Sequence, residues 1–239
     1  MKKFFILNFS FLILNFFSHA QVFIIGGKGI LNYSTLLHDN PTIYGDKLDK
    51  VFTLNGQGGI YLRYYFNEAT YYSTTNISLG VELLYGNYGQ KYEGQYSDSA
   101  SGYSVNSKIS LSGLDIPVMV HVRGQAGLYA EAGVSFGIIS GVNVDYSRSP
   151  ENISTPNFSG TSVDSSFVKN NLSGIFGFGI DSELNDHLNL TIGFRITYGL
   201  TDLTEPQKNY VPDYKELHSA NIGFVVGVAY ILNFFHDYH

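Results

Sequence analysis

The sequence predicts an all-β protein: an eight-stranded antiparallel up-and-down transmembrane β-barrel. Three observations support this class, namely a two-residue alternation of apolar side chains, connections that alternate between long and short, and a shortage of charge. Only 14% of the 239 residues are charged, against about 25% in a typical soluble domain. The shortage indicates a surface that does not face water.

The alternation is clearest in residues 188 to 201, LNLTIGFRITYGLT, where every second residue is large and apolar. A two-residue period places such residues on one face of a strand and their neighbours on the other. Seven further stretches alternate in the same way, and none has a helical period. The predicted strands cover residues 22–34, 51–66, 76–90, 107–122, 126–146, 168–182, 187–201 and 219–235.

The connections between these strands alternate in length. Those at 123–125 and 183–186 are tight turns, and the one at 67–75 is intermediate. Long loops at one end and short turns at the other are typical of an up-and-down barrel. No linker interrupts the pattern, so we expect residues 21–239 to form one barrel domain. The long polar connections are 35–50, 91–106, 147–167 and 202–218.

The polar face decides whether the barrel is soluble or lies in a membrane. A soluble lipocalin-type barrel would carry Lys and Glu on that face, but in 127–141 and 221–234 it consists mainly of Gly, Ala, Ser and Asn. Small residues suit the narrow interior of an eight-stranded barrel. The apolar face therefore points outward to lipid, with aromatic girdles near the strand ends. These aromatic residues are Tyr33, Phe52, Tyr64, Phe66, Tyr85, Tyr146, Tyr198 and Phe234.

Charged residues within the strands fall on the polar face. Lysine or arginine on the lipid face would cost roughly 2–4 kcal/mol at the bilayer midplane. Lys108 is the exception, and we expect a β-bulge at Ser112-Gly113 to turn it inward. The predicted interior charges are Lys28, Arg63, Glu82, Asp115, Glu131, Asp181 and Arg195.

Three cations and four carboxylates in a narrow lumen predict an ion-pair network that plugs the barrel, because unpaired buried charges are costly. Lys28, Glu82, Asp115, Glu131 and Arg195 are expected at similar heights, with Arg63 nearer the short turns. The alternative is that these charges line a selective channel or gate. We favour the plug, since side chains alone can fill so narrow a barrel.

The first twenty residues predict a cleaved secretory signal. Lys2 and Lys3 precede an apolar stretch, and Ser18-His19-Ala20 supplies small residues at the cleavage site, leaving Gln21 as the mature start. The alternative, a membrane anchor, is disfavoured because Asn8 and Asn15 interrupt a run shorter than the roughly 20 residues a spanning helix needs. The absence of cysteine excludes disulfides and thiolate chemistry.

The sequence offers no catalytic, cofactor or metal site, and we expect no enzymatic activity. His121 lies toward the turns, and His218 lies in a charged loop segment where histidines are usually solvated. His121 shares its strand face with Asp115 but lies away from the outer leaflet, where catalysis at lipid would need it. His218 lies at the correct end, with Asp213 and Glu216 nearby, but we expect it to be solvated. The net charge of −6, without a basic run, also argues against a nucleic-acid partner.

Several stretches resemble the PorT-like outer-membrane β-barrel family. They are FIIGGKGILNYS, LDIPVMVHVR, GLYAEAGVSFGIISG, IGFRITYGLTDL and IGFVVGVAYILNF, in strand order over essentially the whole mature chain. Pro117 fits the family habit of a proline after an acidic and an apolar residue, and we expect a local distortion there because proline cannot donate to the ladder. The resemblance implies a Gram-negative outer-membrane location, and some relatives support protein secretion and gliding. The segment 98–100, DSA, resembles an O-glycosylation site, which makes Ser99 a candidate.

Three function classes remain open. We prefer a structural or interaction barrel, surrounded by outer-membrane lipid, whose outer loops 147–167 and 202–218 meet a partner protein or surface ligand and which could support protein secretion. The second is a narrow pore for small solutes. The third is a lipid-modifying outer-membrane enzyme.

Overall fold

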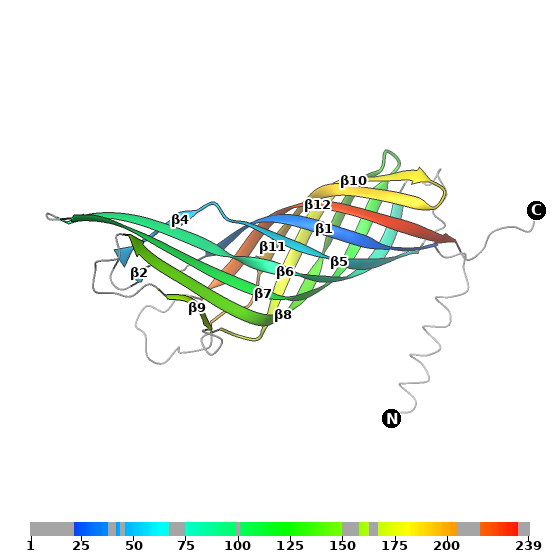
Figure 1. The fold of residues 1–239 in the computed structure, drawn as a ribbon. Helices are drawn as coiled ribbons and strands as arrows, with labels where there is room; N and C mark the ends of the chain where they lie inside the picture. The colour runs from blue at the N-terminus through cyan, green and yellow to red at the C-terminus, as the bar shows by residue number, and fades with distance from the viewer. Residues whose placement is uncertain are drawn as a thin grey trace, which may run out of the picture.

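Among the described residues of the computed structural model, eight long antiparallel strands close into a ring. Figure 1 shows their arrangement. The structure describes residues 22–37, 42–43, 46–66, 75–98, 101–149, 158–162, 167–204 and 216–233. Each ring strand pairs with the next, and the last pairs with the first over the full length of both. This confirms the predicted fold class. The ring strands are β1 (Val22–Leu37), β5 (Leu54–Tyr65), β6 (Thr75–Asp98), β7 (Ser101–Gly124), β8 (Leu128–Ser149), β10 (Asn170–Asn185), β11 (Leu188–Gly199) and β12 (His218–Asn233).

Four short strands lie outside the ring, mostly in stretches that were expected to be loops. The strand β4 (Asp49–Val51) pairs with β6, and β9 (Phe158–Ser162) pairs with β8. The strands β2 (Thr42–Ile43) and β3 (Asp46–Lys47) pair with each other. In the part of the chain that the structure describes, no helix is long and apolar enough to cross a membrane.

The strands β6 and β7 extend well beyond their predicted ends. The connection 91–106 was expected to be a loop, and this is wrong for 91–98 and 101–106, which continue the hairpin as far as the pair Asp98 and Ser101. The apolar alternation fades there, but backbone pairing continues without it. The buried side chains of Tyr92 and Val105 pack inside this extension, and aromatic and β-branched residues favour strands.

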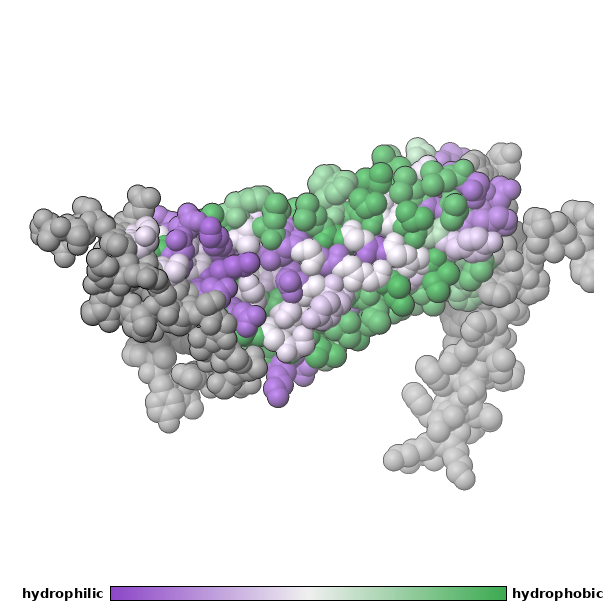
Figure 2. Space-filling model, viewed as in Figure 1, coloured by the Kyte–Doolittle hydropathy of each residue, from purple (hydrophilic) through white to green (hydrophobic). Residues whose placement is uncertain are grey.

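Exposed apolar side chains occur on all eight ring strands and form a belt. On the face shown in Figure 2, hydrophilic residues lie beyond both edges of this belt. On β6 it runs from Ile77 to Tyr85, about nine residues, which matches the roughly 9–11 residues of a membrane-spanning strand. Aromatic pairs mark its edges: Tyr33 stacks on Phe52 with ring centroids 4.7 Å apart, and Tyr64 meets Phe66 edge-on at 5.2 Å. On β6, β11 and β12 the belt comprises Ile77, Leu79, Val81, Leu83, Tyr85, Ile192, Phe194, Ile196, Tyr198, Ile222, Phe224, Val226, Val228 and Tyr230.

The short turns lie together at one end of the barrel. Gly127 adopts a φ of 76°, a left-handed conformation that favours glycine, and its N–H donates to the Gly124 carbonyl at 3.0 Å. Arg123 and Glu183 form an ion pair of 2.5 Å that joins this turn to the one between β10 and β11.

The expected bulge is present, but on the neighbouring strand. Ser112 pairs with Gly141 and Gly113 pairs with Ile139, so Ser140 of β8 is the extra residue. The alternation of β7 is therefore unbroken and Lys108 stays exposed, so the prediction that it turns inward is wrong. Lys108 lies opposite Lys91, in the extension beyond the belt, where a charge on the outer face meets no hydrocarbon.

Pro117 interrupts the ladder between β6 and β7, as expected. Pairing runs up to Val81 with Val118 and resumes at Leu84 with Asp115 in the same register. Because proline lacks only its own N–H, the distortion is confined to the positions between these two pairs. On its other side Pro117 stays paired with Ser135 of β8.

Candidate functional site

Inward side chains stack in four layers along the lumen. Alternate residues of every strand point inward, and the layers run from the turns to the loops. On β5 two layers interleave, because Arg63 of the charged network lies between Tyr65 and Tyr61 of the floor. The first layer is an apolar floor of Ile24, Tyr61, Tyr65, Ala229 and Ile231. The second is a charged network and the third a polar chamber. The fourth is an apolar cap of Leu36, Tyr88, Leu111, Ile139, Val142, Leu203 and Leu217.

Arg195 is the centre of the charged network. Its Nη1 and Nη2 donate to the two carboxylate oxygens of Glu82 at 2.7 and 3.0 Å. Its Nε and Nη2 donate to Oε1 of Glu131 at 2.9 and 2.6 Å. The Lys28 ammonium of β1 also donates to Oε1 of Glu82, the oxygen that Arg195 Nη2 contacts. One guanidinium of β11 thus ties together carboxylates from β6 and β8.

A second cluster lies beside it, nearer the turns. Arg63 Nη1 donates to Asp181 Oδ2 at 2.7 Å, and Thr191 donates to Asp181 Oδ1 at 2.5 Å. His121 Nε2 lies 2.8 Å from Asp181 Oδ2, while its Nδ1 lies 3.7 Å from Glu131 Oε2. The imidazole therefore links the two clusters, and its ring stacks on Tyr129 with centroids 4.6 Å apart.

The network balances three cations against three carboxylates, and all six side chains are buried. Buried charges are tolerated when they are paired and hydrogen-bonded. Tyr61 adds a ring face 4.7 Å from the Lys28 ammonium and 5.6 Å from the Arg63 guanidinium, a favourable cation–π geometry.

A glycine on β10 leaves room for the contact between Glu131 and Arg195. Gly177 of β10 lies in register between Glu131 of β8 and Arg195 of β11. A Cβ at Gly177 would lie 2.7 Å from Glu131 Oε1. Without a side chain there, Glu131 can cross over β10 to reach Arg195.

Asp115 departs from the expected arrangement. Six of the seven predicted interior charges meet in the network, whereas Asp115 makes no ion pair among the described residues and accepts a hydrogen bond from Gln57 Nε2 at 2.7 Å. It was expected at the height of Glu131, but the register of the β7–β8 hairpin pairs His121 with Glu131, and Asp115 with Gly137 further toward the loops.

Two members of the interior were missed by sequence reasoning. His121 was considered as a catalytic candidate and not as part of the network. The hairpin between β7 and β8 turns at 125–127, which pairs His121 with Glu131, whereas the turn predicted at 123–125 would pair His121 with Gly127. Gln57 gives no signal in the sequence, because its contacts with Asn32 and Asp115 join three different strands.

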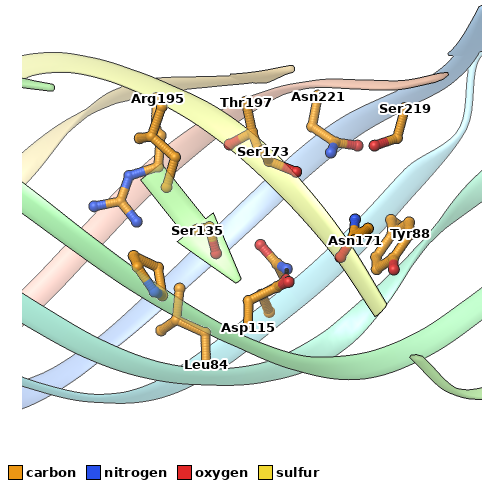
Figure 3. A pocket seen from close by; sticks show the side chains of 13 residues that line it. Leu84, Tyr88, Asp115, Ser135, Asn171, Ser173, Arg195, Thr197, Ser219 and Asn221 are labelled. Carbon is orange, nitrogen blue, oxygen red and sulfur yellow. Dashed lines mark hydrogen bonds between the residues drawn. The ribbon is translucent and has the colours of Figure 1, made fainter. Parts of the chain in front are cut away.

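The polar chamber lies between the network and the cap. Figure 3 shows Asp115, Ser135, Asn171, Ser173, Thr197 and Asn221 around one space, with Arg195 at its network side. Tyr88 borders both the chamber and the cap. Among the described residues, the chamber is thus a space in the lumen that side chains do not fill.

Other candidates from the sequence lie elsewhere. His218 has Glu216 3.5 Å away at the loop end. Among the described residues, no group of three or more His, Asp or Glu is arranged to hold a metal ion. Ser99, the first twenty residues and most of the outer loops 147–167 and 202–218 lie outside the residues that the structure describes.

A closed ring of strands, apolar outside and ionised inside, defines an integral outer-membrane β-barrel. The chain belongs to the family described as "Outer membrane protein beta-barrel domain", whose model matches residues 19–205. Its location is the outer membrane of a Gram-negative bacterium. No curated protein matches the chain.

Solved outer-membrane barrels are similar to the chain at low identity. Neisserial surface protein A has 10% identity and a TM-score of 0.36, with 87% of this chain and 96% of that chain covered. Ail, the attachment invasion locus protein of Yersinia pestis, has 12% identity and a TM-score of 0.36, with 90% and 99% covered. The outer membrane protease OmpT from Escherichia coli has 11% identity and a TM-score of 0.32, with 90% and 97% covered. These values are too low to carry any of those proteins' functions to this chain.

Proposed function

We propose that this protein is a non-conducting outer-membrane barrel that acts through its external surface, as a structural or interaction protein. The observation that carries the proposal is the Arg195 guanidinium, which bridges Glu82 and Glu131 across the lumen. An interior crossed by paired side chains supports a plug and argues against a pore.

The contacts of the network connect many walls of the ring. Arg195 joins β11 to β6 and β8, and Lys28 joins β1 to β6. Arg63 joins β5 to Asp181 on β10. A hydrated ion would have to break several of these buried pairs at once, and each separated charge would then lack a partner. The cap adds a second, apolar barrier above.

The extension of β6, β7 and β8 supports an interaction role. These strands continue past the belt into the region of the long loops (Figure 1). Their outer residues there include the exposed ion pair of Lys91 and Glu93. A paired, water-facing surface of this kind suits contact with a partner protein, including one that takes part in protein secretion. Catalysis on lipid is less well supported, because the His121 side chain is enclosed in the lumen and only 1% exposed.

Planar-bilayer recording of the purified full chain tests the plug. We expect no steady openings from the unaltered protein, and openings in Arg195→Met, because loss of the guanidinium removes the central bridge. The matched control is Lys91→Met, which breaks an exposed pair outside the lumen and should stay closed. Steady openings of the unaltered protein would favour the narrow pore instead.

Photo-crosslinking in native outer membranes tests the interaction role. A crosslinker at Glu93 in the extension should give specific protein adducts that are absent when the crosslinker stands at Ser182 near the turns. Adducts at neither site would contradict the role. Lipid A that changes in mass in a deletion strain would favour the enzyme instead.

A further inference from the structure

We propose that the polar chamber binds a small ligand that carries a primary ammonium group. This goes beyond the proposed function, which concerns the closed lumen and the external surface. The inference rests on the oxygen atoms that converge in the chamber and on the charge left over there.

Buried acceptors in the chamber lack donors. Among the residues that the structure describes, none donates a hydrogen bond to Asn171 Oδ1 or Ser135 Oγ, although the two residues are only 5% and 3% exposed. A buried polar atom without a partner is costly and requires an explanation. Both side chains line the same space (Figure 3), so one bound molecule can satisfy both.

Two of the acceptors face each other above Gly137. A Cβ at this position would lie 1.8 Å from Asn171 Oδ1 and 2.7 Å from Asp115 Oδ1, so the two oxygens come together over the bare glycine backbone. A carboxylate oxygen and an amide oxygen both accept hydrogen bonds and repel each other unless a donor lies beside them. The arrangement thus suits a group that donates more than one hydrogen bond.

A relay of side chains fixes Asp115 in this orientation. Asn32 Nδ2 donates to Gln57 Oε1 at 2.9 Å, and Gln57 Nε2 donates to Asp115 Oδ2 at 2.7 Å. The first bond determines which end of the Gln57 amide reaches Asp115. One carboxylate oxygen is then satisfied by the protein, and the other is presented to the chamber.

The chamber also has a net negative charge. The three cations of the network are matched by Glu82, Glu131 and Asp181. Arg195 borders the chamber, but its Nε, Nη1 and Nη2 are all directed at Glu82 and Glu131. Among the described residues that line the chamber, Asp115 is the remaining charge.

A primary ammonium group fits this lining better than a metal ion does. Its three N–H donors can be shared among the four available acceptors, Asp115 Oδ1, Asn171 Oδ1, Ser135 Oγ and Asn221 Oδ1. Calcium takes about six to eight oxygen ligands, usually with several carboxylates, and the chamber offers one. A ligand from outside must pass the apolar cap, so we expect slow entry.

NMR titration of the isotope-labelled full chain in detergent micelles tests the proposal, with ethylammonium chloride as the probe. So small a probe binds at millimolar concentrations at best, which NMR detects. We expect saturable shifts of the amide signals of Gly137 and Asn171. Tetramethylammonium, which has the charge but no N–H, should give none at equal ionic strength.

Variants of the chamber give the decisive comparison. Asp115→Asn keeps the shape but removes the charge, and Gly137→Ala fills the space above the glycine; each should weaken binding by at least about tenfold. Matched controls are Glu93→Gln, at an exposed carboxylate, and Gly29→Ala, where a Cβ would meet no atom within 4 Å. A chamber that holds water only would give no saturable shifts, and this overturns the proposal. Equal binding of tetramethylammonium, or unchanged binding in Asp115→Asn, also overturns it.

Discussion

Arg195 holds Glu82 by two parallel hydrogen bonds of 2.7 and 3.0 Å, although 113 residues separate them in the chain. This two-point geometry is the strong form of an arginine–carboxylate contact. Because the same guanidinium also satisfies Glu131, its removal leaves two buried carboxylates short of donors.

Arg195→Met should therefore lower the free energy of unfolding by about 3–5 kcal/mol, the usual effect of removing one partner from a buried ion pair. Urea unfolding in detergent micelles measures this. Lys91→Met, in an exposed pair, should change the free energy by less than about 1 kcal/mol. Equal effects of the two substitutions would contradict a buried network.

Gly59→Ala should prevent normal assembly of the barrel. A Cβ at Gly59 would lie 1.9 Å from the backbone carbonyl oxygen of Leu83, and ladder backbone cannot move aside as a flexible side chain can. Gly29→Ala, on the neighbouring strand, should be neutral because its Cβ would meet open space. Heat-modified migration in gels, which separates folded from unfolded barrels, compares the two yields.

Val81→Arg should destabilise the barrel by roughly 2–4 kcal/mol, because Val81 is exposed at the middle of the belt on β6 and arginine there faces hydrocarbon. Asn87→Arg, exposed on the same face of β6 but beyond the belt, should have almost no effect. Unfolding in lipid vesicles tests the pair, and a similar cost at both positions would place the membrane boundary elsewhere.

The mature protein should begin at Gln21. Lys2, Lys3 and the small residues before position 21 predict signal cleavage there. Intact-mass measurement of the protein from purified outer membranes checks this directly. A mass that includes residues 1–20 would show that the segment is retained.

The ring itself could be predicted from the sequence because each membrane-spanning strand must alternate between lipid and lumen. That constraint ends at the edge of the belt, so the alternation could not reveal the extension of β6 beyond Gln90. There the hairpin is held by backbone pairing with β7 and by buried side chains such as Tyr92.

The interior charges could be assigned to the lumen from their position on the polar face. Their pairing could not, because it depends on the register and stagger of strands that the sequence does not determine. Asp115 illustrates the difference: its face was predicted correctly, but its partner is Gln57 and not a cation. Lys108 shows the same limit, since the bulge lies on β8 and leaves the lysine outside.

The network also bears on how the protein enters the membrane. Lys28 lies on the first strand of the ring and Arg195 on the seventh, and both reach Glu82 on the third. A partly inserted sheet that lacks β11 would leave Glu82 and Glu131 without the Arg195 guanidinium. We therefore expect these carboxylates to be fully paired only after β11 has joined the sheet.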